Sequence, residues 1–197
     1  MPHRRRFDHD ASLPVHVTVR AVAGFSWFRR QRIARAVFDV IRRAQREDFR
    51  IVEFSLQTNH LHLLVEAVST SALRSGVAGL KIRMAKRINR LLLRRGALWA
   101  GRWHGRLVTS LRQVRRVLVY VLANAIKHGS VSDNPDPLSS APWFDGWARK
   151  PTGGKLARAP NPALPARTHA LARGWRRYGL LRADEHPAST LAKRTIS

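Results

Sequence analysis

The order of strand and helix patterns along the chain predicts an α+β fold, in which helices pack on a ferredoxin-like, antiparallel-containing sheet. Short β-rich or alternating segments predict strands at 14–22, 49–56, 59–66 and 97–109. Apolar residues at helical spacing predict helices at 29–45, 70–93 and 111–127. The second and third strands are separated only by residues near Gln57, which predicts a tight turn within the order β-α-β-β-α-β-α.

The first half of the chain supports these elements in turn. Gly24 punctuates the chain after the 14–22 strand. The 29–45 helix carries basic residues outside and an apolar stripe formed by Ile33, Val37, Val40, Ile41 and Ala44. The 49–56 segment is β-rich, and the 59–66 strand has one apolar face, formed by Leu61, Leu63 and Val65.

The 70–93 helix, for which Thr70 is a candidate cap, has two contrasting sides. Its apolar stripe consists of Leu73, Val77, Leu80, Met84, Ile88 and Leu91. Its other side carries the basic residues Lys81, Arg83, Lys86, Arg87 and Arg90. This basic side fits a solvated surface as well as it fits a track for nucleic-acid phosphates.

The 97–109 strand is entered through a segment that mixes tryptophans with basic residues. Trp99 and Trp103, with Arg102 between them, suit base stacking beside phosphate contacts. The two tryptophans fit a place in the core equally well. His104 has no spacing partner, so a structural role competes with an approach to a metal or to DNA.

The 111–127 helix is expected to carry functional side chains. Its apolar stripe is formed by Leu111, Val114, Leu118, Val121, Leu122 and Ala125. Ser110 and Gln113 predict a capping box at its start, and Gly129 suits its C-terminal end. Tyr120 and Asn124 lie one helical turn apart on the flank of the stripe and face the same way.

The character of the chain changes after residue 130. Seven prolines interrupt every long pattern: Pro135, Pro137, Pro142, Pro151, Pro160, Pro162 and Pro165. We therefore expect a basic lead at 1–13, one domain at 14–131 and a Pro-rich basic C-terminal extension at 132–197. Within the extension, the aromatic segment 143–147 is expected to dock back on the core, 149–167 to form a basic linker and 168–181 a short helix.

The composition predicts a polyanionic partner. The net charge is +25 over 197 residues and the pI is about 12, a balance typical of nucleic-acid-binding proteins but shared by ribosomal and membrane-surface proteins. The absence of cysteine excludes disulfides and thiolate chemistry. Neither a secretory signal nor an apolar run long enough for a membrane span is recognisable, so a cytoplasmic, nucleoid-associated protein without membrane contact is expected.

Two histidines are the first candidates for chemistry. His60 and His62 flank Leu61 on a predicted strand, and residues two apart on a strand point to the same face. Two adjacent imidazoles can share a divalent ion, although the pair also fits two polar residues on a half-buried strand. The amide oxygen of Asn124 can complete a site for Mg²⁺ or Mn²⁺. The phenol of Tyr120 would then be placed to attack a phosphodiester, whereas the alternative is a half-buried tyrosine with its hydroxyl in water.

These residues together resemble the HUH single-strand nucleases, and most closely the REP-associated tyrosine transposases. The resemblance extends in order over residues 14–129: His16-Val17-Thr18-Val19-Arg20 looks like the first strand, Thr58-Asn59-His60-Leu61-His62-Leu63-Leu64-Val65 like the histidine motif, and Tyr120-Val121-Leu122-Ala123-Asn124 like the tyrosine helix. The resemblance implies that His60, His62 and Asn124 are metal ligands and that Tyr120 is the nucleophile.

The chain departs from the family pattern at two places. Gln57-Thr58 stands where the family usually has Met-Pro, and Ala125-Ile126 follows the helix asparagine where Asn-Pro is frequent. Neither change removes a ligand or the nucleophile. Both changes bear on the geometry of the site and on which DNA sequence the protein prefers.

The resulting hypothesis is a metal-dependent endonuclease and strand transferase that acts on single-stranded or hairpin DNA through a 5′-phosphotyrosine, without a small-molecule cofactor. The expected DNA contacts are Arg20, Lys81, Arg87, Arg102, His104 and Lys127. With one nucleophilic tyrosine, rejoining requires either the same residue twice or a second protomer, so the protein is expected to be a monomer or homodimer. The alternatives are a non-catalytic hairpin reader on the same fold and an RNA-binding or ribosome-associated protein. Tyr178 is the competing nucleophile, but it has no Asn or His partner at helical spacing.

Overall fold

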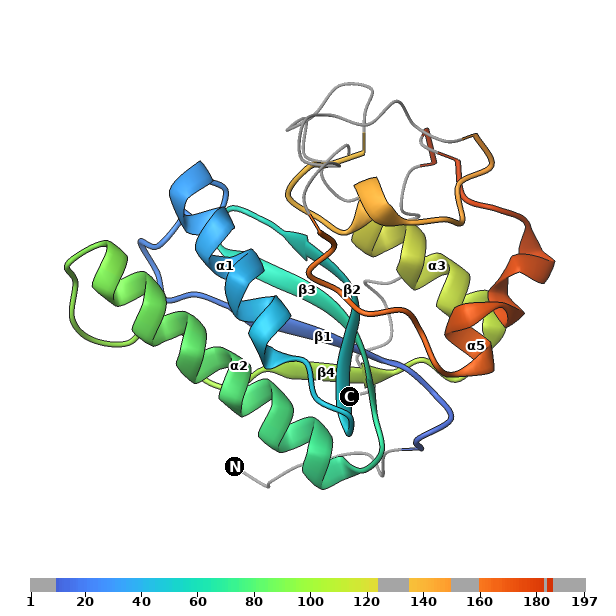
Figure 1. Ribbon diagram of the computed structural model, residues 1–197, viewed down its shortest axis with the longest axis horizontal. Helices are drawn as coiled ribbons and strands as arrows, with labels where there is room; N and C mark the ends of the chain where they lie inside the picture. The colour runs from blue at the N-terminus through green and yellow to red at the C-terminus, as the bar shows by residue number, and fades with distance from the viewer. Residues whose placement is uncertain (1–9, 124–134, 150–159, 183, 186–197) are drawn as a thin grey trace.

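A four-stranded antiparallel sheet with the strand order β2-β3-β1-β4 forms the centre of the molecule. The computed structural model describes residues 10–123, 135–149, 160–182 and 184–185. The elements are β1 Val15–Arg20, α1 Gln31–Ala44, β2 Phe49–Leu56, β3 His60–Ala67, α2 Thr70–Leu91, β4 His104–Leu107, α3 Leu111–Leu122, η1 Ala141–Trp143, α5 His169–Ala172 and η3 Gly174–Tyr178 (Figure 1). This order and pairing confirm the predicted ferredoxin-like α+β fold.

The last strand is the main difference from the sequence prediction. β4 covers only the second half of the predicted 97–109 strand. Gly101 has a φ of 101°, a conformation that interrupts an extended chain and that glycine adopts without a steric cost. Before this glycine, only an isolated bridge between Trp99 and Ala21 continues the sheet. The segment predicted as one strand therefore consists of a turn followed by a short strand.

Helix ends differ from the predictions by small amounts. Ser69 rather than Thr70 caps α2, because its side chain accepts a hydrogen bond from the Ala72 N–H at 3.0 Å. α3 ends at Leu122 with Ala123 as its C-cap, whereas residues 124–127 of the predicted helix and Gly129 lie outside the described residues. The predicted short helix at 168–181 consists of two short helical segments, α5 and η3.

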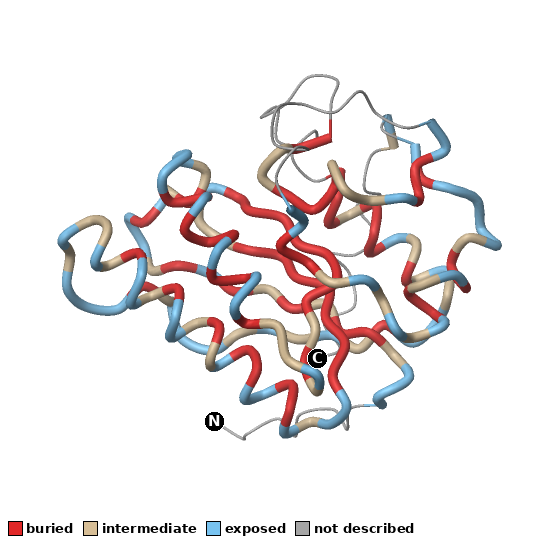
Figure 2. Tube along the Cα trace, viewed as in Figure 1, coloured by how far each residue is buried: buried red, intermediate tan, exposed pale blue. Residues whose placement is uncertain are grey.

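Successive side chains of β1 and β3 alternate between the two faces of the sheet, and a separate core lies on each face. Val15, Val17 and Val19 of β1 are buried on the side of the sheet that α1 and α2 cover. Leu64 of β3 points to the other side, where it packs in a second core with Val117 and Val121 of α3 and with C-terminal residues. Figure 2 shows the buried residues running along the sheet and the inner sides of the helices. A β-strand places alternate side chains on opposite faces, so this sheet carries a helical layer on each side.

The outer edge of β2 is covered by residues 135–147. The Leu56 N–H donates to the Leu138 carbonyl at 2.9 Å, and the Ser140 N–H donates to the Phe54 carbonyl at 2.9 Å. An exposed strand edge can pair with another chain, and this segment satisfies the edge instead.

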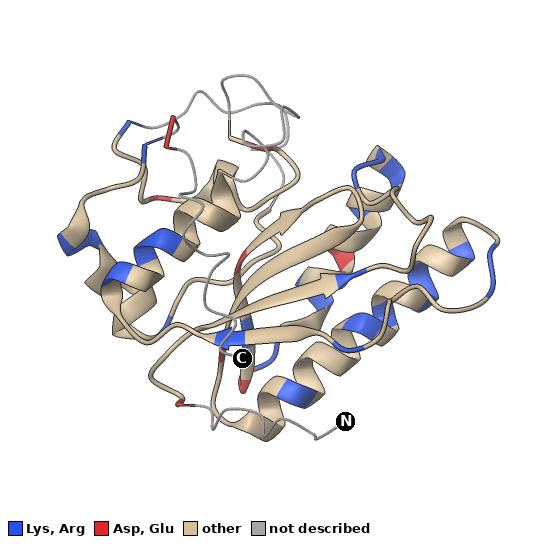
Figure 3. Cartoon of the chain, turned by 180° about the vertical axis from the view of Figure 1, so that it is seen from behind, with Lys and Arg blue, Asp and Glu red and all other residues tan. Residues whose placement is uncertain are grey.

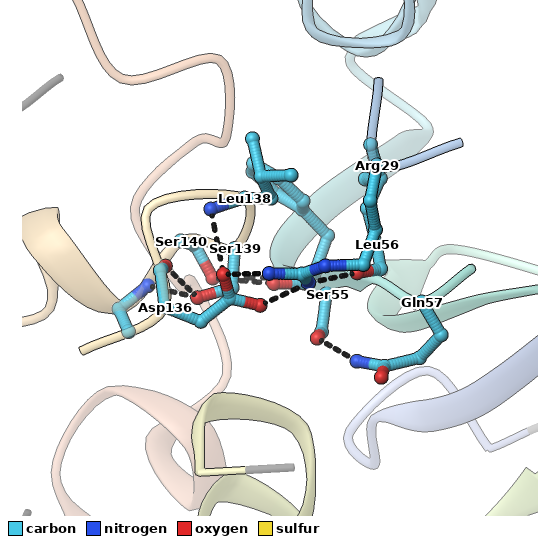
Figure 4. Close-up of polar contacts among 10 residues, drawn as sticks. Arg29, Ser55, Leu56, Gln57, Asp136, Leu138, Ser139 and Ser140 are labelled. Atoms are coloured by element: carbon cyan, nitrogen blue, oxygen red, sulfur yellow. Dashed lines mark hydrogen bonds and ion pairs between the residues drawn. The ribbon is translucent and has the colours of Figure 1, made fainter. Parts of the chain in front are cut away.

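A buried ion pair holds this segment in place. Both guanidinium nitrogens of Arg29 donate to the Asp136 carboxylate, at 2.7 and 2.8 Å, and Arg29 also donates to the Leu56 carbonyl at 2.7 Å (Figure 4). The Asp136 side chain is only 1% exposed. A two-pronged arginine–carboxylate contact offsets much of the desolvation cost of burying the two charges.

The C-terminal extension contacts both cores: Ala163 and Trp143 pack in or against the core beside α1, whereas Phe144, Trp147 and Trp175 pack on the side of α3. Trp175 is 1% exposed and stacks on Phe144 with ring centroids 5.7 Å apart, and Phe144 also contacts Trp147. Glu66 of β3 accepts hydrogen bonds from the backbone N–H and the hydroxyl of Thr168 at 2.9 and 2.8 Å. The expected docking of the 143–147 segment is thereby confirmed. In the described part of the chain, no helix is long and apolar enough to cross a bilayer.

Glu53 is a buried carboxyl group between β2 and the segment that covers it. Its Oε2 accepts a hydrogen bond from the Ser140 hydroxyl. Burial raises the pKa of Glu53 to about 8, and the nearby Asp145 adds to the rise, while the Ser140 hydrogen bond opposes it. Folding therefore binds a proton at neutral pH.

We predict that Glu53 makes the protein less stable as the pH rises from about 5 to about 8. The unfolded carboxyl is ionised above its ordinary pKa near 4.5, whereas the folded one stays protonated until about 8. The free energy of unfolding should therefore decrease by about 1.4 kcal/mol per pH unit in this window, in addition to other titrations. Urea unfolding followed by tryptophan fluorescence should show a flatter pH dependence for Glu53→Gln than for the wild type.

The matched control is Glu47→Gln, which changes an exposed carboxylate. Its pH dependence should follow that of the wild type. Equal slopes for Glu53→Gln and the wild type would contradict a proton bound at Glu53 on folding.

Candidate active site

His60 and His62 stand side by side on β3, as the strand periodicity predicts. Their Nε2 atoms are 3.0 Å apart, and their ring centroids are 4.7 Å apart with the rings nearly perpendicular. Two cis ligands about 2.1 Å from an octahedral ion lie about 3 Å from each other, so the pair fits two positions of one coordination sphere. Imidazole nitrogens are suitable ligands for divalent transition metals.

Tyr120 on α3 reaches the same point from the layer above the sheet. Its Oη lies 3.3 Å from the His62 Nε2, and the two ring centroids are 4.9 Å apart. Burial raises the pKa of the half-buried phenol above its ordinary value near 10, although the positive charge of Arg20 opposes the rise. The phenol is therefore protonated at neutral pH, and its reaction as a nucleophile requires loss of that proton.

The start of α3 is fixed by local hydrogen bonds close to those predicted. The Ser110 side chain accepts from the Gln113 N–H at 3.3 Å, as expected for an N-cap. The Gln113 side chain accepts from the Thr109 N–H at 3.1 Å, one residue before the position of a standard capping box. Since Val117 and Val121 pack in the second core, the helix is oriented so that Tyr120 faces the histidines.

Asn124 and Lys127 lie outside the described residues. Within the residues that the structure describes, no group of three His, Cys, Asp or Glu side chains is arranged to hold a metal ion. The proposed third ligand is the amide of Asn124, four residues after Tyr120 in the sequence, so its role stays a prediction.

His16 belongs to this cluster and is a residue that sequence reasoning did not single out. Its Nε2 lies 3.3 Å from the His62 Nδ1, and its ring contacts Tyr120 edge-on at 5.6 Å. Burial lowers the pKa of His16 to about 4, with a further contribution from Arg106, so the ring is neutral at pH 7. The Thr18 hydroxyl lies 3.2 Å from the same His62 nitrogen. The alternation of polar residues with valines in β1 was the sequence pattern that could have placed His16 on a polar face of the sheet.

Hydrogen bonds to the Nδ1 atoms favour one orientation of both candidate ligands. The His60 Nδ1 lies 2.8 Å from the Asn59 side-chain oxygen, which can only accept, so Nδ1 carries the hydrogen. This tautomer leaves the Nε2 lone pair of His60 for a ligand role. When the His62 Nε2 presents its lone pair, its Nδ1–H donates to Thr18 or His16.

The sheet face that carries the two histidines also carries basic side chains. Arg20 pairs with His60 across the β1–β3 ladder, and Thr18, which is opposite His62, pairs with His104 of β4. Arg20, His104 and Arg106 are exposed. The structure thus brings two of the predicted DNA contacts, Arg20 and His104, to the same face as the histidines.

The other predicted DNA contacts among the described residues are Lys81, Arg87 and Arg102, and they lie elsewhere. Arg87 is exposed on α2, which covers the opposite face of the sheet, and Figure 3 shows basic residues along that helix. Arg102 is exposed just before β4. Lys81 is half-buried, and its ammonium donates to the Gly101 carbonyl at 2.6 Å. The predicted contacts therefore occupy two surfaces rather than one.

The two tryptophans before β4 pack against the core. Trp99 stacks on Phe28 at 5.6 Å, and its Nε1–H donates to the Lys81 carbonyl at 2.9 Å. Together with Trp103, it lines an apolar groove of about 380 Å³ beside α2. The contacts of Trp99 favour the core interpretation of that residue.

The family model for IS200-like transposases matches residues 11–123. This match covers more than half of the chain and includes the two histidines and Tyr120. The chain belongs to the IS200-like transposase family. Transposases are enzymes that move DNA segments, so membership implies an enzyme of DNA transposition.

Two solved structures align with this IS200-like chain. One, described as a REP-associated tyrosine transposase bound to a REP hairpin, aligns with a TM-score of 0.53 and 17% identity over 66% of this chain and 76% of the other. A chain from Deinococcus radiodurans R1, described as a candidate transposase, aligns with a TM-score of 0.43 and 15% identity over 67% and 98%. The first likeness shows a common fold. No curated protein sequence matches this chain.

Proposed function

We propose that the protein is a metal-dependent, single-strand-specific DNA endonuclease and strand transferase with Tyr120 as its nucleophile. The observation that supports this proposal best is the convergence of three atoms. The Tyr120 Oη and the His60 Nε2 lie within 3.3 and 3.0 Å, respectively, of the His62 Nε2. A nucleophile next to two candidate metal ligands is an arrangement that suits metal-assisted phosphoryl transfer through a covalent intermediate.

In the proposed reaction, His60, His62 and Asn124 hold Mg²⁺ or Mn²⁺. The bound ion would supply stabilisation of the negative charge that develops on the scissile phosphate. The Tyr120 oxygen forms a bond to phosphorus, while the bond from phosphorus to the 3′-oxygen breaks. The phenol proton passes to solvent, which reaches the half-buried ring, and the 3′-oxygen leaves as a hydroxyl. A 5′-phosphotyrosine keeps the bond energy, so a 3′-hydroxyl can reverse the step elsewhere.

The proposed substrate is single-stranded DNA next to a hairpin. The structural relative described as bound to a REP hairpin supports this choice, as does the net charge of +25. Arg20, His104 and Arg106 are exposed on the same sheet face as the histidines and would contact the strand that enters the site. The proposed place of action is the cytoplasmic nucleoid, with the protein acting as a monomer or homodimer.

The direct test is a denaturant-resistant protein–DNA adduct. We expect a labelled single-stranded hairpin library with Mn²⁺ to give an adduct that is lost in Tyr120→Phe, in His60→Ala and with EDTA. The duplex forms of the same sequences should give none. Denaturing gel electrophoresis of the labelled DNA provides the readout.

Tyr178→Phe is the matched control, because it removes the only other tyrosine phenol of the chain and should leave the adduct intact. An adduct that survives Tyr120→Phe but not Tyr178→Phe would show that the nucleophile was misassigned. Tight binding of hairpins with no adduct for any of them would favour a non-catalytic hairpin reader.

We also predict that His16 supports metal binding through His62. His16→Phe keeps a ring of similar shape but removes the Nε2 that faces the His62 Nδ1 at 3.3 Å. Loss of an outer hydrogen-bond partner of a ligating histidine weakens metal affinity by about 10- to 100-fold, which Mn²⁺ titration followed by electron paramagnetic resonance would measure. His104→Gln alters an exposed histidine on the same face and should bind Mn²⁺ as the wild type does. Equal affinities for His16→Phe and His104→Gln would refute a role for His16.

A further inference from the structure

Arginines line the side of α3 that faces away from the two cores. The buried residues of α3 occupy one side of the helix: Val114, Val117, Leu118, Val119, Val121 and Leu122. Arg112 and Arg116 are exposed on the other side, and they precede Tyr120 by two turns and by one turn. Residues four apart lie next to each other on a helix surface, so these arginines form a row that ends at the tyrosine.

The row continues onto the C-terminal extension at Tyr178. The Arg112 guanidinium lies 5.3 Å from the centre of the Tyr178 ring, and the Arg177 guanidinium lies 5.6 Å from the same centre. The Tyr178 residue is 39% exposed. Cation–π contact with a ring limits the orientations of a long arginine side chain, so the ring places both cations at one surface.

The carboxylates around this surface are paired with other arginines. Glu185 pairs with Arg115 at 2.6 Å, and Asp145 pairs with Arg176 at 2.7 Å. Among the described residues, Arg112, Arg116 and Arg177 form no ion pair. Like charges held close together repel one another, which is a cost that an anionic ligand would offset.

The segment that carries Tyr178 is fixed to α3. Trp175, in the same η3 helix, is almost fully buried in the second core. The Arg115 guanidinium donates to the Gly179 carbonyl at 2.8 Å and to the Leu180 carbonyl at 3.0 Å, besides its pair with Glu185. The two halves of the surface are therefore held together before any ligand binds. A preformed surface costs less ordering on binding.

We propose that Arg112, Arg116 and Arg177, with Tyr178 between Arg112 and Arg177, form a track that binds the phosphates of the single strand next to Tyr120. Arg112 and Arg116 are separated by about 6 Å along the helix axis, a step that an extended strand can follow from phosphate to phosphate. The track gives the C-terminal extension a role in holding substrate. That the bound DNA strand continues to Tyr120 rests on the proposed function, whereas the phosphate-binding surface itself does not.

The test measures binding without chemistry. Fluorescein-labelled dT30 is titrated with the Tyr120→Phe protein in EDTA, over a series of salt concentrations. Replacement of Arg112, Arg116 and Arg177 by alanine in that background should reduce the slope of log affinity against log salt by about 2, and the affinity in 0.1 M salt by about 100-fold. Tyr178→Ala should weaken binding several-fold, and Tyr178→Phe should retain it because the ring remains.

The matched control removes three exposed arginines of α1, namely Arg32, Arg35 and Arg43, which lie on the other face of the sheet. Each triple variant must keep the unfolding midpoint of its parent. Equal losses in the two triple variants would show a general charge effect and overturn the track. A greater loss on a 30-base-pair duplex than on dT30 would overturn its assignment to single strands. Because EDTA and Tyr120→Phe remove the chemistry, absence of the covalent adduct would leave this result unaffected.

Discussion

The antiparallel register between β1 and β3 is the constraint on which the rest of the structure depends. It places Thr18 opposite His62 and Arg20 opposite His60. Because side chains alternate along a strand, the same register buries the valines of β1 under α1 and α2. A shift of β1 by one residue relative to β3 would turn the valines of β1 toward the site and His16 and Thr18 toward the apolar core.

The second layer supplies what the sheet alone lacks. α3 packs between the sheet and the aromatic residues Phe144, Trp147 and Trp175, and this position holds Tyr120 against His62. The C-terminal extension is therefore part of the structure that supports the candidate nucleophile. The buried ion pair between Arg29 and Asp136 holds the segment that follows α3 against the edge of the sheet. Loss of this packing would affect the site without changing any of its side chains.

Much of this arrangement could be predicted from local patterns. The strand period alone places His60 beside His62, and helical spacing places Tyr120 beside the apolar stripe of α3. The meeting of Tyr120 with His62 depends on packing between residues 58 positions apart, and family resemblance rather than spacing predicted it. His16 was missed because its contact with His62 spans 46 positions and follows from a strand register that no local pattern encodes. The length of β4 was overestimated because Gly101 turns a strand-like segment.

The proposed mechanism requires His60 and His62 to hold a divalent ion within reach of the Tyr120 phenol. Anomalous diffraction from crystals soaked in Mn²⁺ would locate that ion. We expect one strong peak at about 2.1–2.3 Å from the Nε2 atoms of both His60 and His62, with the Tyr120 hydroxyl facing it. If saturating Mn²⁺ gave no peak at the two histidines, or a peak bound by other residues away from Tyr120, the proposed metal site would be wrong.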